Sequence, residues 1–126
     1  MSHCLDSSAV LEWLRGTEPA ASRVEELLPT KPLMSWINLG EIYYVVHRAE
    51  GADAASDTVR WLRPRLTLDL PGEDRILAAA AIKATHPLAY ADAFAVATAL
   101  AHGATLVTGD PEILEADGDW PVEDVR

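Results

Sequence analysis

The stretch Leu88–Glu112 constrains the fold of this chain more than any other part of the sequence. It predicts a helix of small residues over about Ala89–His102, a stop at Gly103, and a short apolar strand over Thr105–Val107. A turn follows the strand. A helix that leads directly into a short apolar strand is one αβ unit, so this stretch indicates an α/β fold.

Two carboxylates belong to this αβ unit. Asp92 falls in the first turn of the helix, and Asp110 lies just past the carboxyl end of the strand. Open α/β sheets bind their ligands outside the carboxyl ends of the strands. The unit therefore predicts a place for chemistry near these two acids.

The rest of the chain also alternates short apolar segments with helical ones. This alternation predicts a central parallel sheet with helices on both faces, a three-layer α/β/α sandwich. Helix ends are set by caps and breakers, as where Ser35 precedes the longest helix and Gly51 ends it. We expect strands at His3–Leu5, Pro32–Met34, Leu66–Leu68, Thr105–Val107 and around Trp120–Val122, and helices over Ala9–Arg15, Pro19–Leu28, Trp36–Glu50, Ala52–Leu62, Pro71–His86 and Ala89–His102.

Length and composition exclude several classes of protein. With 126 residues, 49% of them hydrophobic, the chain fits a single domain over 1–126 that buries a core. Its one cysteine, Cys4, excludes an internal disulfide and a multi-cysteine zinc site. No apolar run reaches the roughly 18 residues of a membrane helix. The first residues also lack the pattern of a signal peptide, so we expect a cytoplasmic protein without membrane contact.

The formal net charge of −10 restricts the partners of the chain. Such a charge argues against a protein that holds nucleic acid by general charge attraction. It fits a solvated acidic surface, or carboxylates that bound cations neutralise.

Four acidic residues could meet at one edge of the predicted sheet: Asp6, Glu41, Asp92 and Asp110. Asp6 and Asp110 each follow a strand, whereas Glu41 and Asp92 lie on helices that start at the same edge in right-handed βα units. Clustered carboxylates repel one another unless cations neutralise them, and an all-oxygen ligand set suits Mg²⁺ or Mn²⁺. Two such ions about 3.5–4 Å apart can activate a water against a phosphodiester.

Each of these acids also has a structural explanation. Asp6 could be only the N-cap of the first helix, Asp92 could only stabilise a helix N-terminus, and Asp110 could be an ordinary turn residue. Glu41 differs because its neighbours on the helix are apolar or aromatic. A carboxylate in such surroundings needs a partner or a cation.

Cationic and aromatic residues leave two explanations open. Arg60, Arg63 and Arg65 cluster at a helix end, where they could contact phosphates or simply complement the helix dipole. The tryptophans and tyrosines could stack on bases or contact a partner, with core packing as the alternative. The four histidines show no ligand spacing.

Four short motifs cover nearly the whole chain in a fixed order: Leu5-Asp6-Ser7-Ser8, Asn38-Leu39-Gly40-Glu41, Ala91-Asp92-Ala93 with Ala97-Thr98-Ala99, and Leu106-Val107-Thr108-Gly109-Asp110. In these motifs the chain resembles the PIN-domain ribonucleases, and among them the VapC-type toxins of toxin-antitoxin pairs. It departs from them in a short, polar first strand and in its strong acidity.

The resemblance implies an α/β/α sandwich and Mg²⁺- or Mn²⁺-dependent cleavage of RNA. It also implies a homodimer and a cognate antitoxin that lays a peptide over the site and inhibits it. The residues that match the family's acidic metal site, followed by two supporting hydroxyls, are Asp6, Glu41, Asp92 and Asp110, then Ser7 and Thr108.

We therefore expect a divalent-metal-dependent endoribonuclease, the toxin of a toxin-antitoxin pair, that hydrolyses RNA with a metal-activated water. Two alternatives stay open. One is a PIN-like binding or regulatory module with little nuclease activity, which the negative charge motivates. The other is a Mg²⁺-dependent hydrolase of a small substrate. Against the latter, the sequence has no Gly-rich phosphate loop and no Ser or Cys nucleophile beside a base.

Overall fold

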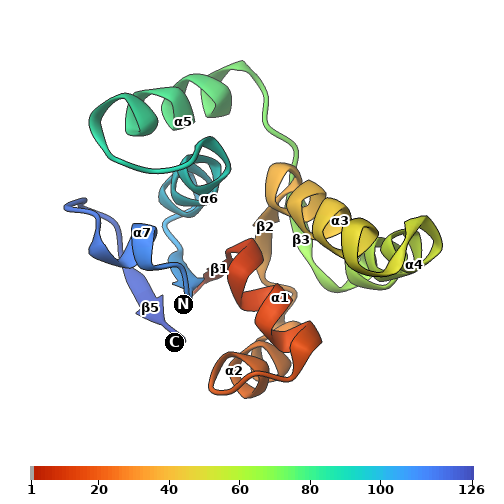
Figure 1. The fold of residues 1–126 in the computed structure, drawn as a ribbon. Helices are drawn as coiled ribbons and strands as arrows, with labels where there is room; N and C mark the ends of the chain where they lie inside the picture. Colours follow the sequence, from red (N-terminus) through yellow and green to blue (C-terminus); the bar gives the residue numbers. More distant parts are fainter. Residues whose placement is uncertain (1) are drawn as a thin grey trace.

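A five-stranded parallel sheet forms the centre of the molecule. The computed structural model describes residues 2–126, and its strands lie in the order β3-β2-β1-β4-β5 (Figure 1). Every neighbouring pair is parallel, so the expected parallel sheet is confirmed. The strands are β1 (His3–Leu5), β2 (Leu33–Ser35), β3 (Thr67–Asp69), β4 (Thr105–Thr108) and β5 (Val122–Asp124).

The strand order has one reversal. From β1 the chain moves outward to β2 and β3, and it then returns to place β4 on the other side of β1. A reversal of this kind leaves a crevice at the carboxyl ends of the two central strands, where open α/β sheets bind ligands. The crevice therefore lies beyond the ends of β1 and β4.

Helices cover both faces of the sheet, which confirms the α/β/α sandwich. The helices α1 to α4 enclose one hydrophobic cluster, and α6 and α7 enclose the other. Helix α5 packs along α6 (Figure 1). The helices are α1 (Ser7–Arg15), α2 (Ala20–Leu27), α3 (Trp36–Glu50), α4 (Ala52–Leu62), α5 (Glu73–Thr85), α6 (Tyr90–Ala101) and α7 (Pro111–Glu115), with 3-10 turns η1 (Leu28–Thr30) and η2 (Arg63–Arg65).

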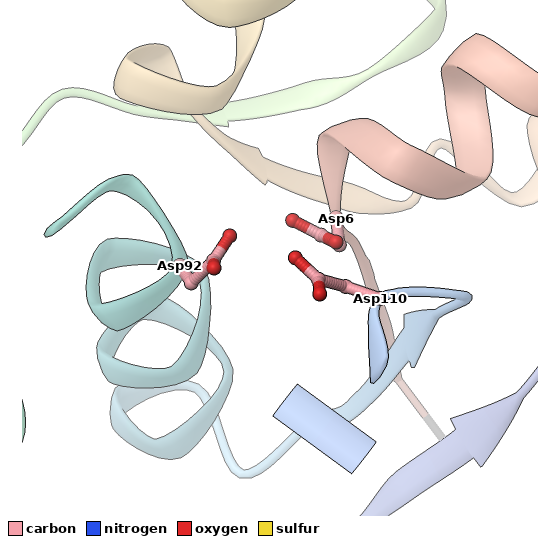
Figure 2. Close-up of side chains that lie close together, drawn as sticks. All are labelled: Asp6, Asp92 and Asp110. Carbon is pink, nitrogen blue, oxygen red and sulfur yellow. The ribbon is translucent and has the colours of Figure 1, made fainter. Parts of the chain in front are cut away.

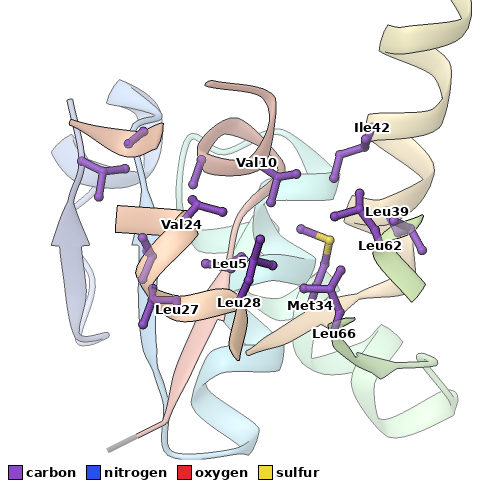
Figure 3. Packing of buried hydrophobic residues seen from close by; sticks show 14 of the residues in the cluster. Leu5, Val10, Val24, Leu27, Leu28, Met34, Leu39, Ile42, Leu62 and Leu66 are labelled. Atoms are coloured by element: carbon purple, nitrogen blue, oxygen red, sulfur yellow. The ribbon is translucent and has the colours of Figure 1, made fainter. Parts of the chain in front are cut away.

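Alternation along the strands divides the core between the two faces. In β1, Leu5 points into the cluster under α1 to α4, whereas its neighbour Cys4 belongs to the cluster under α6. In β4, Val107 and Leu106 divide in the same way. Successive side chains of a strand point to opposite faces, so strands buried on both sides are apolar throughout. Figure 3 shows the larger of the two clusters.

Some element boundaries differ from the sequence-based expectation. The strands β3 and β5 begin one and two residues later than expected, because pairing with β2 and β4 sets their register. Helix α7 was not expected at all. It forms because Pro111 occupies its first turn and the Asp110 side chain caps it. Helix α3 is only partly buried, since Ile37 is 37% exposed.

In the described part of the chain, no helix has the length and apolar composition needed to cross a membrane.

Candidate metal centre

Asp6 lies in the crevice directly after β1. Its backbone N–H donates to the carbonyl of Val107 at 3.0 Å, which joins the end of β1 to β4. The residue occupies the N-cap position of α1, yet its side chain makes no capping hydrogen bond. Instead its Oδ2 accepts hydrogen bonds from Ser8 Oγ at 2.7 Å and Thr108 Oγ1 at 2.9 Å. Asp6 is thus the N-cap residue of α1, but its carboxylate binds the two hydroxyls and not the helix backbone.

Asp110 approaches the same crevice from the end of β4. Its Oδ1 accepts from the backbone N–H of Glu112 at 2.9 Å, so this residue does serve as a helix cap. The hydroxyls of Ser8 and Thr108 also hold its loop, since they accept from the backbone N–H groups of Gly109 and Asp110 at 3.1 and 3.0 Å. The same two hydroxyls thus position both strand-end aspartates.

Asp92 completes the cluster from the first turn of α6, where it is 6% exposed. One carboxylate oxygen from each of Asp6, Asp92 and Asp110 lies within 4.8 Å of the other two. Figure 2 shows the three side chains pointing toward one another from β1, α6 and β4. Residues at positions 6, 92 and 110 thus meet because two parallel strand ends and one helix N-terminus share an edge.

Burial and mutual repulsion make it hard for these aspartates to be ionised together. The pKa of Asp6 is raised to about 6, chiefly by burial, with the charges of Glu41 and Asp110 adding to the rise and the hydroxyls of Ser8 and Thr108 opposing it. Burial is also the main reason that the pKa of Asp92 lies far above its ordinary value, with the Asp6 and Asp110 carboxylates adding to it.

A hard divalent cation fits this donor set. The three ligand groups are all carboxylates, which suit Mg²⁺ and Mn²⁺ rather than zinc or copper. The Oδ1 atom of Asp6 is buried and has no hydrogen-bond partner. Within residues 2–126, no Lys, Arg or His side chain forms an ion pair with Asp6, Asp92 or Asp110. A cation would meet both needs, because it neutralises the cluster and engages the unpaired oxygen.

Glu41 stands beside the three aspartates and is not part of the close group. Its Oε1 accepts from Ser7 Oγ and from Asn38 Nδ2, each at 2.9 Å. Its charge still raises the pKa of both Asp6 and Asp92. The expected meeting of four acids thus occurs at close range for three of them. Of the two expected hydroxyls, Ser7 contacts Glu41 and Thr108 contacts Asp6.

Asn38 also belongs to the site, although the sequence analysis gave this residue no role of its own. It is fully buried, and its Nδ2 donates to Glu41 Oε1 at 2.9 Å and to the carbonyl of Ala91 at 3.1 Å. Both neighbours are acceptors, so the amide nitrogen must face them. Ala91 directly precedes Asp92, and Asn38 therefore ties Glu41 on α3 to the first turn of α6. The signal in the sequence is its position one helical turn before Glu41.

Comparison with known proteins shows to which family the chain is similar. The model of the PIN domain family matches residues 3–119. No curated protein sequence matches the chain.

Several solved structures share its fold. VapBC2 from Rickettsia felis, bound to a DNA fragment from their promoter, superimposes with a TM-score of 0.77 at 17% identity over 100% of both chains. VapBC-1 from nontypeable Haemophilus influenzae superimposes with a TM-score of 0.70 at 23% identity over 98% of each chain. VapC20 from Mycobacterium tuberculosis, a sarcin-ricin loop cleaving toxin, superimposes with a TM-score of 0.71 at 18% identity. The match covers 95% of this chain and 100% of VapC20.

Proposed function

Because this chain belongs to the PIN domain family over residues 3–119, we propose that it is a divalent-metal-dependent endoribonuclease. The observation that carries the proposal is the group of three aspartates within 4.8 Å of one another, with a buried, unpaired oxygen on Asp6. An arrangement of this kind costs stability unless a cation occupies it, and it is therefore suited to metal-assisted hydrolysis. Mg²⁺ or Mn²⁺ is the expected cofactor.

Asp6, Asp92 and Asp110 would hold the metal in this proposal. A bound Mg²⁺ or Mn²⁺ supplies an activated water and neutralises charge on the phosphodiester. Asp6 is kept in place by two hydroxyls, and Asp110 is kept in place by its bond to the first turn of α7. Two of the three ligands are thus held in place by the protein itself, as catalysis by positioning requires.

Glu41 would act on the water or complete the ligand set. Its two hydrogen bonds, from Ser7 and Asn38, both reach Oε1 and leave Oε2 for another contact. A carboxylate held by one oxygen keeps a defined direction for the other. We propose that Oε2 would accept a proton from the reacting water or would serve as a further ligand.

We further propose that the chain is the toxin of a toxin-antitoxin pair, with RNA as its substrate. The support is that its structural relatives include VapC20 and the VapBC2 and VapBC-1 structures. The same relationship supports a cognate antitoxin as partner. A homodimer, a single domain over residues 1–126 and a cytoplasmic location complete the proposal.

The test is RNA cleavage by the purified protein freed of any bound partner. The assay compares Mg²⁺, Mn²⁺ and EDTA, and it includes Asp92→Asn beside the control Asp74→Asn. Asp74 is an exposed acid in the first turn of α5, so it matches Asp92 in helix position but not in surroundings. We expect cleavage that needs metal, disappears in Asp92→Asn and persists in Asp74→Asn. Metal-loaded protein that cleaves no RNA pool would refute the nuclease and favour the binding module.

A further inference from the structure

A pocket of about 600 Å³ lies along helices α3 and α4, outside the aspartate cluster. It is lined by Tyr43, Ser56, Val59, Arg60, Arg63 and Pro64. None of these is acidic, although the chain has 20 Asp and Glu against 10 Lys and Arg. The polar lining consists of guanidinium and hydroxyl groups, which donate hydrogen bonds, so the pocket suits an anion.

Positive charge is concentrated around this pocket. The segment 58–66 holds Arg60, Arg63 and Arg65 and no acid. Arg60 pairs with Asp57 at 2.9 Å, but both side chains are more than 70% exposed and such a pair is weak. Within the described residues, Arg63 and Arg65 form no ion pair with a carboxylate. Only Arg63 of these two lines the pocket, because Arg65 donates to the carbonyl of Trp61 at 2.7 Å and lines a different pocket. The guanidinium of Arg63, together with that of the weakly paired Arg60, is therefore left for an external anion.

Aromatic rings accompany these arginines. The guanidinium of Arg63 lies 5.2 Å from the ring centre of Trp36, and that of Arg65 lies 3.9 Å from that of Trp61. These arginines also lie in the last turns of α4 and η2, where they complement the helix dipole. Layers of arginine and aromatic side chains are the surfaces on which nucleic-acid bases stack.

The pocket and the aspartates lie on different sides of α3. Trp36 and Tyr43 are seven residues apart, about two turns, so they lie on the same face of the helix. Asn38 and Glu41, which contact Ala91 and Ser7 beside the acids, lie on the opposite face. A ligand of the pocket is therefore held at a distance from the aspartate cluster.

We propose that this pocket binds one nucleotide of the RNA, away from the bond that is cut. Arg60 and Arg63 hold its phosphate, and Tyr43 lies beside its base. The inference rests on the proposed ribonuclease function, and it names a place where the protein binds the substrate. A pocket of several hundred Å³ has the size of a small-molecule site, which fits a nucleotide unit. RNA can bind a chain of net charge −10 only where the local charge is positive.

The experiment measures binding of a short single-stranded RNA in the Asp92→Asn background, so that cleavage does not interfere. It compares the double variant Arg60→Gln/Arg63→Gln with the control Arg126→Gln. The control removes an arginine that pairs with Asp124 outside the pocket. The affinity is measured over a range of salt concentrations. We expect the slope of log K against log salt to fall by about 0.7 for each lost phosphate contact. The Arg126→Gln variant should leave the slope unchanged.

A second variant covers the case in which losing Arg63 disturbs the packing on Trp36. Ser56 is exposed on α4 and lines the pocket, so Ser56→Glu adds a negative charge without removing a packed group. We expect Ser56→Glu to weaken RNA binding at least tenfold at low salt and Ser56→Gln to leave it within twofold.

Unchanged binding in both sets of variants would overturn the pocket while leaving the nuclease intact. A wild-type protein that neither binds nor cuts RNA with metal present would refute the proposed function itself.

Discussion

Two aspartates at the same edge of the sheet have opposite surroundings. Asp69 ends β3 and Asp6 follows β1, so both stand at the carboxyl end of a parallel strand. Asp69 accepts two hydrogen bonds from Arg75, at 3.2 and 2.9 Å, and lies 3.0 Å from His102 Nε2. These partners hold the pKa of Asp69 below its ordinary value, with the Arg75 hydrogen bonds as the largest cause.

Asp6 has hydroxyl partners and carboxylate neighbours instead. Ser8 and Thr108 donate to one of its oxygens, and its pKa rises to about 6 because burial outweighs those bonds. The difference shows how to separate structural carboxylates from candidate ligands. A structural carboxylate such as Asp69 is neutralised by cations of its own chain, whereas Asp6 is left to a proton or an external cation.

The largest expected effect separates these two residues by activity. Asp6→Asn should abolish RNA cleavage while making the metal-free protein more stable, because it removes a charge that burial disfavours. Asp69→Asn should keep cleavage but cost about 1–3 kcal/mol of unfolding free energy, because it weakens the bonds to Arg75. Cleavage assays and urea unfolding of both variants measure the two effects. Equal loss of activity in both would show that the comparison has no functional meaning.

Metal addition should stabilise the protein through the same cluster. A ligand at 100 times its dissociation constant adds about 2.7 kcal/mol to the unfolding free energy. We expect Mn²⁺ to raise the thermal midpoint of the wild type and to leave that of Asp92→Asn nearly unchanged. Thermal unfolding with and without Mn²⁺ tests this, with Asp74→Asn as the control. An equal rise in Asp92→Asn would place the metal elsewhere.

The two aspartates should also give opposite pH dependences in metal-free protein. The folded-state pKa of Asp6 is raised from 3.8 to about 6, so its contribution to stability is complete below about pH 4 and lost by about pH 6. This lost contribution amounts to roughly 2–3 kcal/mol of unfolding free energy. Asp69 has a lowered pKa, so its contribution is present above pH 3.8 and is lost as the pH falls through its folded-state value.

Urea unfolding in EDTA between pH 4 and pH 7 tests whether the stability of the metal-free protein falls as the pH rises toward the pKa of Asp6. The loss of stability toward pH 6 should be smaller in Asp6→Asn than in the wild type. A variant that loses as much as the wild type would mean that Asp6 carries no raised pKa.

The smallest expected effect concerns Asn38, which acts through Glu41. Asn38→Ala leaves Glu41 with one hydrogen-bond donor, and we expect about a tenfold loss of Mn²⁺ affinity, in the range of about 10–100 for groups that orient ligands. In a Glu41→Gln background, the same change should have no further effect on affinity. Calorimetric titration of the two single variants and the double variant measures this coupling. Additive effects would show that Asn38 does not work through Glu41.

The sequence alone was enough to predict the fold class and the edge where the acids lie. The alternation of apolar strands and helices requires a parallel sheet covered on both faces, and all parallel strands end at one edge. Asp6 and Asp110 each follow a short predicted strand, and Asp92 lies in the first turn of a helix of small residues, so local pattern places each of them at that edge. The short helix that Asp110 caps was not predicted, because the sequence was interpreted as an ordinary turn at this place.

The tertiary structure decided which groups contact one another there. The strand order places β4 beside β1, and only this order brings Thr108 within 2.9 Å of Asp6. The hydrogen bond from Asn38 to the carbonyl of Ala91 joins residues 53 positions apart. No local pattern encodes such a contact, because it depends on how two helices dock on the sheet. For the same reason, three acids form the close cluster while Glu41 is held beside them.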